Sequence, residues 1–376
     1  MKKILFFLES LSGGGAEKVL SDLVTNLDKS KYDITVCTVT DEGVYQDKVS
    51  QCCNYYSFIK MKDIRKGGWT NIWTRTKIKL IYLLPANIVY RLYLKNKYDI
   101  EIAFIEGFAT KLIASSCNKF SRKIAWVHTD MKQNPYADNF YKNKAEHIKT
   151  YLQFDKIICV SEYVKNVFES KFIKSENVIV SYNPVDDCAI MRMSRETCEM
   201  EKPKCMLIGT VGRLVYQKGY FRLVKCIKEL KDRYDFQLWI IGEGPARKEI
   251  ELYIRENSMD GYIKLLGFQK NPYKYLVRCD AFICSSYAEG FCTAATESLI
   301  LGKPVFTVEC AGMKELFGNY KCGEIVDNTD QELLNMLEKL VSNQYKFESY
   351  VENISIRKKD FSIGNAIKNI ENLLDY

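Results

Sequence analysis

The chain has 376 residues, of which 47% are hydrophobic and 27% charged, and its formal net charge is +8. This length predicts two domains with a core each, and this composition is typical of a soluble globular protein. Two histidines, His128 and His147, and fourteen cysteines without a Cys-x-x-Cys spacing argue against a zinc site.

The N-terminal residues predict a buried strand and not a secretion signal. The apolar run in "KKILFFLES" is shorter than the core of a signal peptide and ends at Glu9. We therefore expect the cysteines to be reduced and mostly structural, and the protein to be cytoplasmic.

A glycine loop, "SGGGAEK" at residues 12–18, follows this strand and precedes a helical segment. Gly13, Gly14 and Gly15 let backbone N–H groups approach a phosphate, and the helix that follows points its positive end there. The loop matches neither the dinucleotide fingerprint nor a Walker A loop, so a plain tight turn is an open alternative.

Residues 59–97 carry the positive charge of the chain. They hold ten Lys or Arg against one acid, Asp63, and this local +9 accounts for the whole excess. Aromatic residues are interleaved with these charges, which suits the surface of an anionic membrane at roughly 1 kcal/mol per cation. A solvated helix face is the alternative. Nucleic acid is not expected as a partner, because no recognised motif supports it.

Short runs rich in Ile and Val then alternate with helical segments up to a turn at Asn183-Pro184. This alternation predicts parallel strands covered by helices on both faces. One run, "RKIAWVHTD" at 122–130, reaches His128 at its end. That place favours a donor to a phosphate oxygen or a sugar hydroxyl over a core histidine.

A second alternating series starts at residue 205, so the pattern predicts two doubly wound α/β domains of the Rossmann-like type. We expect a first domain at 1–186, a linker at 187–204 that lacks the pattern, and a second domain at 205–359. A helix at about 360–376 could pack back on the first domain. Ligands bind outside the carboxyl ends of such strands, and here two sets of ends can face one another across a cleft.

The loop "GRLVYQKG", Gly212 to Gly219, lies between a strand and a helix of the second domain. Arg213 can engage an anionic oxygen bidentately, and Lys218 adds a mobile point charge. A solvated pair of surface cations is the alternative.

The stretch "SSYAEGFCTAATESLILGKPVF" places Glu289 before a predicted helix and Glu297 inside it. Eight residues at 1.5 Å each separate them by roughly 12 Å along a helix axis. A hydrolytic carboxylate pair lies about 5 to 9.5 Å apart, so this spacing fits two hydroxyl-bearing groups joined by a diphosphate better. The N–H groups of Phe291, Cys292 and Thr293 would then face the phosphates and the sugar. An ordinary helix-surface acid is the alternative for Glu297.

On these residues the chain resembles the family 4 retaining glycosyltransferases of the GT-B fold. The motifs that carry the resemblance span nearly the whole chain in the family's order: Gly13 to Gly15, His128, Asn183-Pro184-Val185, "GRLVYQKG", "IGEGP" at 241–245, and Glu289 with Glu297. The spacing of the two glutamates after the "GRLVYQKG" loop is the specific signature.

The resemblance implies a catalytic set and a donor-binding set. Arg213 and Lys218 would hold the donor diphosphate, Glu289 the donor sugar, and Glu297 the ribose. His128 would lie on the acceptor side and complete the catalytic set. The other donor-binding positions implied are Gly14, Gly15, Gly212, Gly290, Phe291, Cys292 and Thr293.

Two departures from the family pattern occur. Cys292 stands where the family more often has a small residue or glycine, and "VECAGMKEL" replaces the usual Gly-x-x-Glu segment. Gly312 and Glu315 keep that spacing, and neither departure removes a charged group.

The expected reaction moves a hexose from a nucleotide sugar, a UDP-sugar, to a lipid-linked or glycan acceptor at the inner membrane surface during bacterial polysaccharide synthesis. Charge builds on the β-phosphate as the anomeric bond breaks, and fixed cations stabilise it. No cofactor or metal is expected, because no Asp-x-Asp occurs and two cations can replace Mg²⁺. Retention, implied by the family, would follow a same-face displacement.

Two other functions stay open. A sugar-nucleotide epimerase or a phosphorylase could use the same scaffold, although no lysine is singled out for pyridoxal phosphate. The second is a non-catalytic membrane-binding protein on a degenerate scaffold. The presence of the four charged site residues argues against it: Arg213, Lys218, Glu289 and Glu297.

Overall fold

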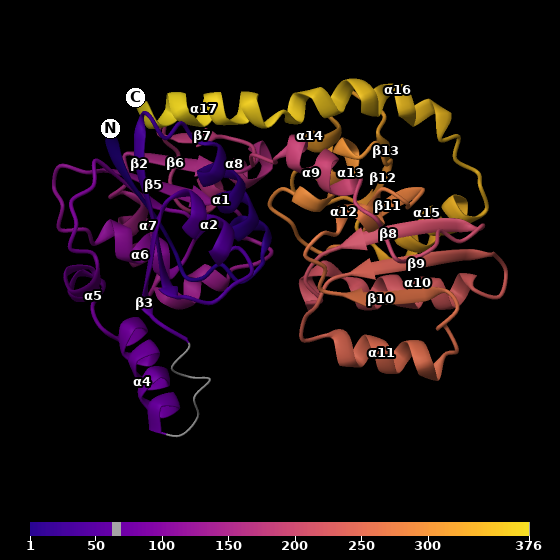
Figure 1. The fold of residues 1–376 in the computed structure, drawn as a ribbon, viewed down its shortest axis with the longest axis horizontal. Coiled ribbons are helices and arrows are strands. Elements are labelled where there is room, and N and C mark those ends of the chain that lie inside the picture. Colours follow the sequence, from indigo (N-terminus) through magenta and orange to yellow (C-terminus); the bar gives the residue numbers. More distant parts are fainter. Residues whose placement is uncertain (62–68, 376) are drawn as a thin grey trace. The chain divides into compact units, whose positions relative to one another are not determined.

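The computed structural model describes residues 1–61 and 69–375, and the side chains of all of these except residues 69–71. The chain forms two compact units. Unit 1 is Met1–Pro184 together with Ile367–Tyr376, and unit 2 is Val185–Ala366. Each unit is an α/β layer structure around one parallel sheet (Figure 1), which confirms the predicted GT-B fold class of two doubly wound domains.

The sheet of unit 1 has seven parallel strands in the order β3-β2-β1-β4-β5-β6-β7. The strands are β1 Lys2–Leu8, β2 Tyr32–Thr40, β3 Asn54–Ile59, β4 Ile100–Ala103, β5 Arg122–Val127, β6 Lys156–Cys159 and β7 Val178–Val180. The central strands are buried on both faces, so they read as unbroken apolar runs. The order reverses direction between β1 and β4, which makes the carboxyl ends of these two strands the expected ligand position.

The helices of unit 1 pack in layers on this sheet. They are α1 Gly15–Asn26, α2 Gln46–Cys52, α4 Trp69–Leu83, α5 Ala86–Tyr93, α6 Phe108–Ala114, α7 Lys144–Tyr151 and α8 Glu162–Lys171, with a 3₁₀ turn at Tyr136–Phe140. Helix α1 packs against α2, whereas α6 packs against α5 and α7.

Edge strand β3 was not predicted from the sequence. Among its residues, only Ile59 is fully buried. An edge strand that buries so little carries neither the unbroken apolar run of a central strand nor a clear alternation, so its pattern is weak.

The sheet of unit 2 has six parallel strands in the order β10-β9-β8-β11-β12-β13. The strands are β8 Met206–Val211, β9 Phe236–Ile241, β10 Ile263–Gly267, β11 Ala281–Cys284, β12 Val305–Val308 and β13 Gly323–Val326. The order reverses between β8 and β11. Strand β13, at the other edge, was also not predicted.

The helices of unit 2 form two layers, because α10 packs against α11 and α15, whereas α9 packs against α12 and α13. They are α9 Asp187–Ser194, α10 Tyr220–Leu230, α11 Arg247–Glu256, α12 Tyr273–Leu276, α13 Thr293–Ile300, α14 Met313–Phe317, α15 Asp330–Val341 and α16 Glu348–Arg357, with 3₁₀ turns at Tyr216–Lys218 and Lys358–Phe361. Helix α17, Ile363–Asp375, starts in unit 2 and continues into unit 1.

The structure differs from the expected linker at 187–204. Residues 187–194 form helix α9, which buries Ile190 and accepts a hydrogen bond from Asn271 on the Met193 carbonyl. The side chain of Asp186 caps this helix by accepting from the N–H of Ala189 at 2.8 Å. The segment is too short for a periodicity argument to reveal its helical face, yet it is an element of unit 2.

The chain returns to unit 1 within α17. From Ile367 on, this helix belongs to unit 1, where Ile370 and Leu374 are buried. Its acids meet the N-terminal unit directly: Glu371 accepts from the N–H of Asp28 at 2.9 Å, and Asp375 pairs with Lys2 at 3.1 Å.

Candidate active site

The residues of unit 2 that were predicted to bind the donor gather at the carboxyl ends of β8 and β11, where the strand order reverses, whereas Gly14 and Gly15 of the same predicted set lie in unit 1. Gly212 to Lys218 follow β8, and Glu289 lies in the loop that joins β11 to α13. This is the position where open parallel sheets bind ligands, because no neighbouring connection covers the strand ends there.

Glycines let this loop pack against its neighbours at backbone distance. A Cβ atom at Gly219, whose φ is +65°, would lie 2.0 Å from the carbonyl oxygen of Ser285. A Cβ atom at Gly242 would lie 1.9 Å from the carbonyl oxygen of Gly212. The glycines of "GRLVYQKG" and "IGEGP" are therefore required for the shape of the loop.

Lys218 and Glu289 form the charged centre of the site. The Lys218 ammonium donates to both carboxylate oxygens of Glu289, at 2.7 and 2.9 Å, and the Ser286 hydroxyl donates to the same carboxylate at 2.5 Å. Burial opposes the charged form of Lys218, but the Glu289 carboxylate outweighs burial and raises the pKa of this ammonium. The Glu289 side chain is 8% exposed, and that of Lys218 is 28% exposed, so part of the lysine side chain is open to solvent.

Arg213 is placed differently. Its side chain is exposed, and in the described part of the chain no hydrogen bond or ion pair holds its guanidinium. The backbone beneath it is fixed, because Leu214 donates to the Glu243 carbonyl at 2.8 Å. Arg213 is therefore a cation on a rigid loop, and its N–H donors have no partner among the residues that the structure describes.

Glu297 lies inside α13, as predicted, and is 3% exposed. The alternative of an ordinary surface acid is thus wrong for this residue. Helix α13 begins at Thr293, and its N-cap residue, Cys292, supplies no side-chain cap. Phe291 and Cys292 are buried beside it at 7% and 6% exposure.

Gly312 supports the loop of Glu289 from the neighbouring strand. Its φ is +78°, and a Cβ atom there would lie 2.8 Å from the Phe291 ring and 3.1 Å from the Gly290 carbonyl oxygen. The glycine that keeps the family spacing is thus a packing requirement of the same site.

Sequence reasoning missed Arg222, which is on α10 and 3% exposed. Its guanidinium donates to the carbonyls of Ser285 and Ser286, at 2.8 and 3.0 Å, and lies 4.0 Å from the centre of the Tyr287 ring. It fixes the backbone that precedes Glu289. An arginine three residues after Gly219, on the buried face of an amphipathic helix, was the available signal.

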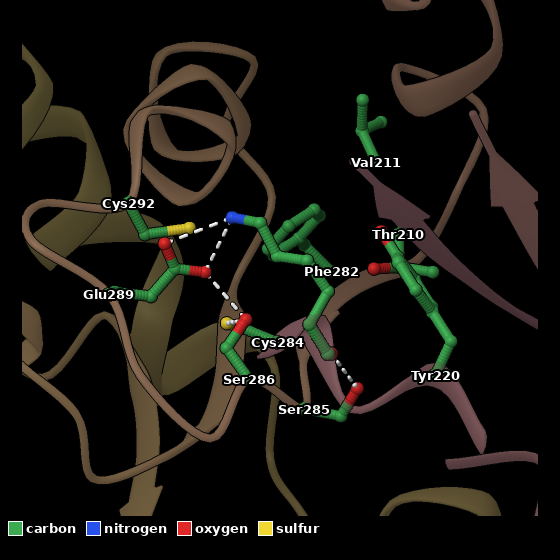
Figure 2. Close-up of a pocket in the computed structure, with 10 residues that line it drawn as sticks. Thr210, Val211, Tyr220, Phe282, Cys284, Ser285, Ser286, Glu289 and Cys292 are labelled. Atoms are coloured by element: carbon green, nitrogen blue, oxygen red, sulfur yellow. Dashed lines mark hydrogen bonds and ion pairs between the residues drawn. The ribbon is translucent and has the colours of Figure 1, made fainter. Parts of the chain in front are cut away.

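Three cysteine thiols adjoin this centre. Hydrogen bonds from Cys292 and Cys310 lower the pKa of the Cys284 thiol well below its usual range. The sulfurs of Cys284 and Cys292 and a carboxylate oxygen of Glu289 all lie within 4.8 Å of one another. Figure 2 shows Cys292, Glu289 and Ser286 pointing toward one cavity.

That cavity is small. Its volume is about 10 Å³, and Lys218, Glu289, Cys284 and Cys292 are among the residues that line it. This is close to the least space that admits a water molecule. A hexose does not fit within it, so a sugar would bind at its mouth and not inside it.

Unit 1 places a second set of polar residues at the carboxyl ends of β1, β4 and β5. The glycine loop follows β1, with Gly13 at φ +106° and Gly14 as the N-cap residue of α1. A Cβ atom at Gly14 would lie 2.3 Å from a carboxylate oxygen of Glu17, a contact that a side-chain shift could relieve.

His128 lies at the end of β5, as predicted, and its ring is 5.0 Å from that of Phe104. Burial lowers the pKa of His128 to about 3, against a hydrogen bond to the Phe104 backbone that raises it. The imidazole is therefore neutral. Its Nε2 is buried and has no partner among the residues that the structure describes.

Two glutamates of unit 1 escaped the sequence reasoning. Glu106 follows β4, is fully buried, and accepts from the N–H groups of His128 and Thr129 at 2.5 and 2.7 Å. Burial raises the pKa of Glu106. Glu9 follows β1, and burial raises its pKa to about 7 against hydrogen bonds from the Phe108 backbone and the Tyr82 hydroxyl. Neither belongs to a motif, so only the topology brings them to notice.

The basic segment 59–97 lies partly outside the described residues, at 62–68. Its described part contains α4, which Figure 1 shows extending away from the sheet of unit 1. Large apolar side chains of α4 and the residues after it are exposed: Ile72, Trp73, Leu80, Leu83, Leu84, Ile88 and Leu92. Among the described residues, no helix is both long and apolar enough to cross a membrane.

Comparisons with known proteins agree with this architecture. The family described as "Glycosyltransferase Family 4" matches residues 13–187, and the family described as "Glycosyl transferases group 1" matches residues 199–357.

Two relatives match nearly the whole chain. The N-acetylgalactosamine-N,N'-diacetylbacillosaminyl-diphospho-undecaprenol 4-alpha-N-acetylgalactosaminyltransferase of Campylobacter jejuni is 26% identical over 96% of this chain and 96% of its own. The lipopolysaccharide 1,6-galactosyltransferase of Salmonella typhimurium is 24% identical over 92% of this chain and 91% of its own. Among solved structures, Anabaena HepE in complex with UDP and glucose has a TM-score of 0.77 at 18% identity, covers both chains fully, and shares the fold.

Proposed function

Because this chain belongs to the glycosyltransferases that carry a family 4 domain and a group 1 domain, we propose that it moves a hexose from a UDP-sugar to a lipid-linked saccharide. The observation that carries the proposal is the Lys218–Glu289 pair at the switch point of unit 2, with the uncommitted Arg213 on the same loop. Bacterial surface-glycan synthesis is the proposed setting, as in the names of the relatives from Campylobacter and Salmonella.

The two cations would act on the leaving diphosphate. An ammonium has three N–H donors, and Lys218 directs two hydrogen bonds at Glu289, so one donor is left for a β-phosphate oxygen. Arg213 can add a bidentate contact. Charge grows on that oxygen as the anomeric bond breaks, so these contacts strengthen in the transition state and lower the barrier. The two cations supply charge that a metal ion supplies elsewhere, so the reaction would need no metal or cofactor.

Glu289 would accept hydrogen bonds from hydroxyls of the donor sugar at the mouth of the small cavity, and Glu297 would accept from the ribose. The backbone from Gly290 to Thr293 would approach the phosphates, because Gly290 has no side chain in the way. Gly212 would leave room beside Lys218. UDP is the proposed nucleotide since HepE, which shares the fold, binds it.

Unit 1 would receive the acceptor. The backbone N–H groups of Gly14 and Gly15 would bind a ligand oxygen, and neutral His128 would hydrogen-bond a sugar hydroxyl. A neutral imidazole is a poor phosphate ligand, so the low pKa favours the sugar of the two ligands considered for this residue. Retention would follow a same-face displacement in which the leaving phosphate takes the acceptor proton. A trapped covalent glycosyl-enzyme would contradict it.

A membrane surface is the proposed location of the acceptor, and α4 supports it. Five apolar residues of α4 and its C-terminal end lie on one side of the helix. At 100° per residue they fall within about 120° of the helix circumference: Ile72, Trp73, Leu80, Leu83 and Leu84. The buried Thr74 and Ile81 fall on the other side, while exposed Arg75, Lys77 and Lys79 flank the apolar stripe. An exposed apolar stripe between cations fits the boundary between lipid headgroups and acyl chains.

Donor binding tests the proposal. Thermal shift is measured for the wild type and Glu297→Gln with UDP-, GDP- and ADP-sugars. We expect one UDP-sugar to stabilise the wild type and the variant to lose that stabilisation. Glu332→Gln, a half-buried acid in the first turn of α15 in the same unit, is the matched control and should keep the shift. No stabilisation of the wild type by any nucleotide sugar would overturn the proposed function.

A further inference from the structure

The proposed sugar transfer uses the backbone of Cys292 but neither its thiol nor that of Cys284, and the fold brings these two thiols together although no Cys-x-x-Cys spacing joins them. We propose that the thiols of Cys284 and Cys292 and the carboxylate of Glu289 form a site for a thiophilic divalent cation, Zn²⁺, and that this cation inactivates the donor site. The metal site stands on its own geometry, and only the inactivation rests on the proposed function.

The three groups come from one short segment. Cys284 ends β11, Glu289 lies in the loop, and Cys292 is the N-cap residue of α13. All three are buried, and their ligand atoms lie within 4.8 Å of one another. Tetrahedral zinc, with bonds of roughly 2.0 to 2.3 Å, needs its ligand atoms roughly 3.5 to 3.8 Å apart. If the three ligand atoms move about 1 Å closer together, they supply three of the four ligands of a tetrahedral zinc ion.

The cavity suits one atom and little more. Its volume is about 10 Å³, and the same three residues and Lys218 are among the ten residues that line it. Figure 2 shows the Cys292 sulfur and the Glu289 carboxylate directed into this space from neighbouring positions of the loop. A single ion with at most one water is the class of ligand that fits.

The ligand chemistry selects the metal. Two sulfurs favour thiophilic cations such as Zn²⁺, whereas Mg²⁺ and Ca²⁺ prefer oxygen. Binding releases to solvent the protons that the two thiols carry and transfers no electrons. The two positive charges of Zn²⁺ balance the two thiolates, so the metal with its sulfur ligands is neutral beside the Glu289–Lys218 pair.

Occupancy by zinc and donor binding compete for one carboxylate. Lys218 now directs hydrogen bonds at both oxygens of Glu289, and Ser286 donates to one of them. A metal that takes one of these oxygens displaces the ammonium and turns Glu289 away from a sugar hydroxyl. The same step therefore removes two groups of the proposed donor site.

Cobalt titration tests the metal site. Reduced, metal-free full-length protein is titrated with Co²⁺ while the sulfur-to-cobalt charge-transfer absorption is recorded. We expect the band in the wild type, its loss in Cys284→Ala and in Cys292→Ala, and its return to zero when Zn²⁺ is added. Cys226→Ala, which removes a buried thiol of α10, and Cys53→Ser, in the adjacent pair Cys52-Cys53, should keep the band. Equal bands in all five proteins, or none in the wild type, would overturn the proposal.

A second measurement tests inactivation. The affinity for the UDP-sugar found by thermal shift is compared with and without Zn²⁺, and then after a chelator. In the wild type we expect Zn²⁺ to weaken donor binding by about tenfold or more, reversibly. In Cys284→Ala the ratio of the two affinities should stay near one, whatever its starting affinity. A protein that binds Co²⁺ through these thiols but no nucleotide sugar would keep the metal site and reject the proposed function. Unchanged donor affinity in zinc-loaded wild type would reject the inactivation.

Discussion

Both units hold polar groups at the carboxyl ends of their parallel strands. The pKa shifts favour a charged group in unit 2 and neutral groups in unit 1. In unit 2, the Glu289 carboxylate raises the pKa of Lys218, so the fold favours the charged ammonium. In unit 1, burial raises the pKa of Glu9 and Glu106 and lowers that of His128, so the fold favours three neutral groups. This contrast supports the proposal that unit 2 binds an anionic diphosphate and unit 1 binds neutral sugar hydroxyls.

The largest expected effect comes from Lys218→Met. It removes the cation that would face the leaving group in the proposed reaction, and it leaves Glu289 buried without its partner. We expect kcat to fall by roughly 10³, the upper end for one electrostatic contact. Stability should fall by about 3 kcal/mol, as for a broken buried ion pair. Radiolabelled sugar transfer and urea unfolding measure the two effects.

The double variant Lys218→Met/Glu289→Gln separates the two effects. It removes the orphaned charge, so most of the lost stability should return while transfer stays low. Lys231→Met, whose partner Asp232 is exposed, is the control for losing a surface ion pair and should change neither property. If the double variant is as unstable as the single one, the stability lost in Lys218→Met does not come from the unpaired charge of Glu289.

Arg213→Ala should give a different result from the same loop. Its guanidinium is exposed and unpartnered in the described part of the chain, so unfolding should be unchanged within about 0.5 kcal/mol. The kcat should nevertheless fall by roughly 10², because an anion contact is lost. Arg255→Ala, an exposed arginine of α11, is the matched control for transfer. An Arg213 variant with full activity would leave Lys218 as the only diphosphate cation of the proposal.

Unit 1 should lose membrane affinity when the cations of α4 are removed. Replacing Arg75, Lys77 and Lys79 with glutamine costs roughly 1 kcal/mol each at an anionic surface, so partition should weaken by up to about 10². Sedimentation with vesicles of anionic and of neutral lipid measures it, and added salt should reduce wild-type binding. A variant with Lys248, Arg255 and Lys264 of unit 2 replaced should still bind. Equal sedimentation of both variants would reject α4 as the docking element.

The sequence predicted the placement of the polar residues in unit 2 better than that of the polar residues in unit 1, for a physical reason. Gly219 and Gly242 each approach another backbone so closely that a Cβ atom would collide, and these requirements space the motifs around Arg213 and Lys218. Central strands such as β1 and β11 are buried on both faces, so their apolar runs are plain.

The parts that could not be predicted depend on contacts between distant segments. Glu106 matters because β4 and β5 pair and bring it beneath His128, which no spacing in one segment reveals. Arg222 acts through carbonyls that are 63 and 64 residues away in the chain. Helix α9 and the edge strands β3 and β13 are too short, or mix buried and exposed residues too irregularly, to show a hydrophobic periodicity. For this reason α9 was interpreted as a linker and the two edge strands were not predicted.

Glu9 gives the smallest effect and the sharpest test of the neutral character of unit 1. Its folded pKa of about 7 is above its usual value of 4.5, so the protonated form is favoured in the fold. The stability it contributes is fully present below pH 4.5 and is lost as the pH rises through 7. Glu9→Gln keeps the neutral form at every pH, so its stability should exceed that of the wild type by about 2 kcal/mol at pH 8 and equal it near pH 4.

Urea unfolding across this pH range measures the difference in stability, and Glu42→Gln, an exposed acid nearby, should follow the wild type. Parallel profiles for wild type and Glu9→Gln would mean that Glu9 is charged in the folded protein, and the contrast between the two units would then rest on Glu106 and His128 alone.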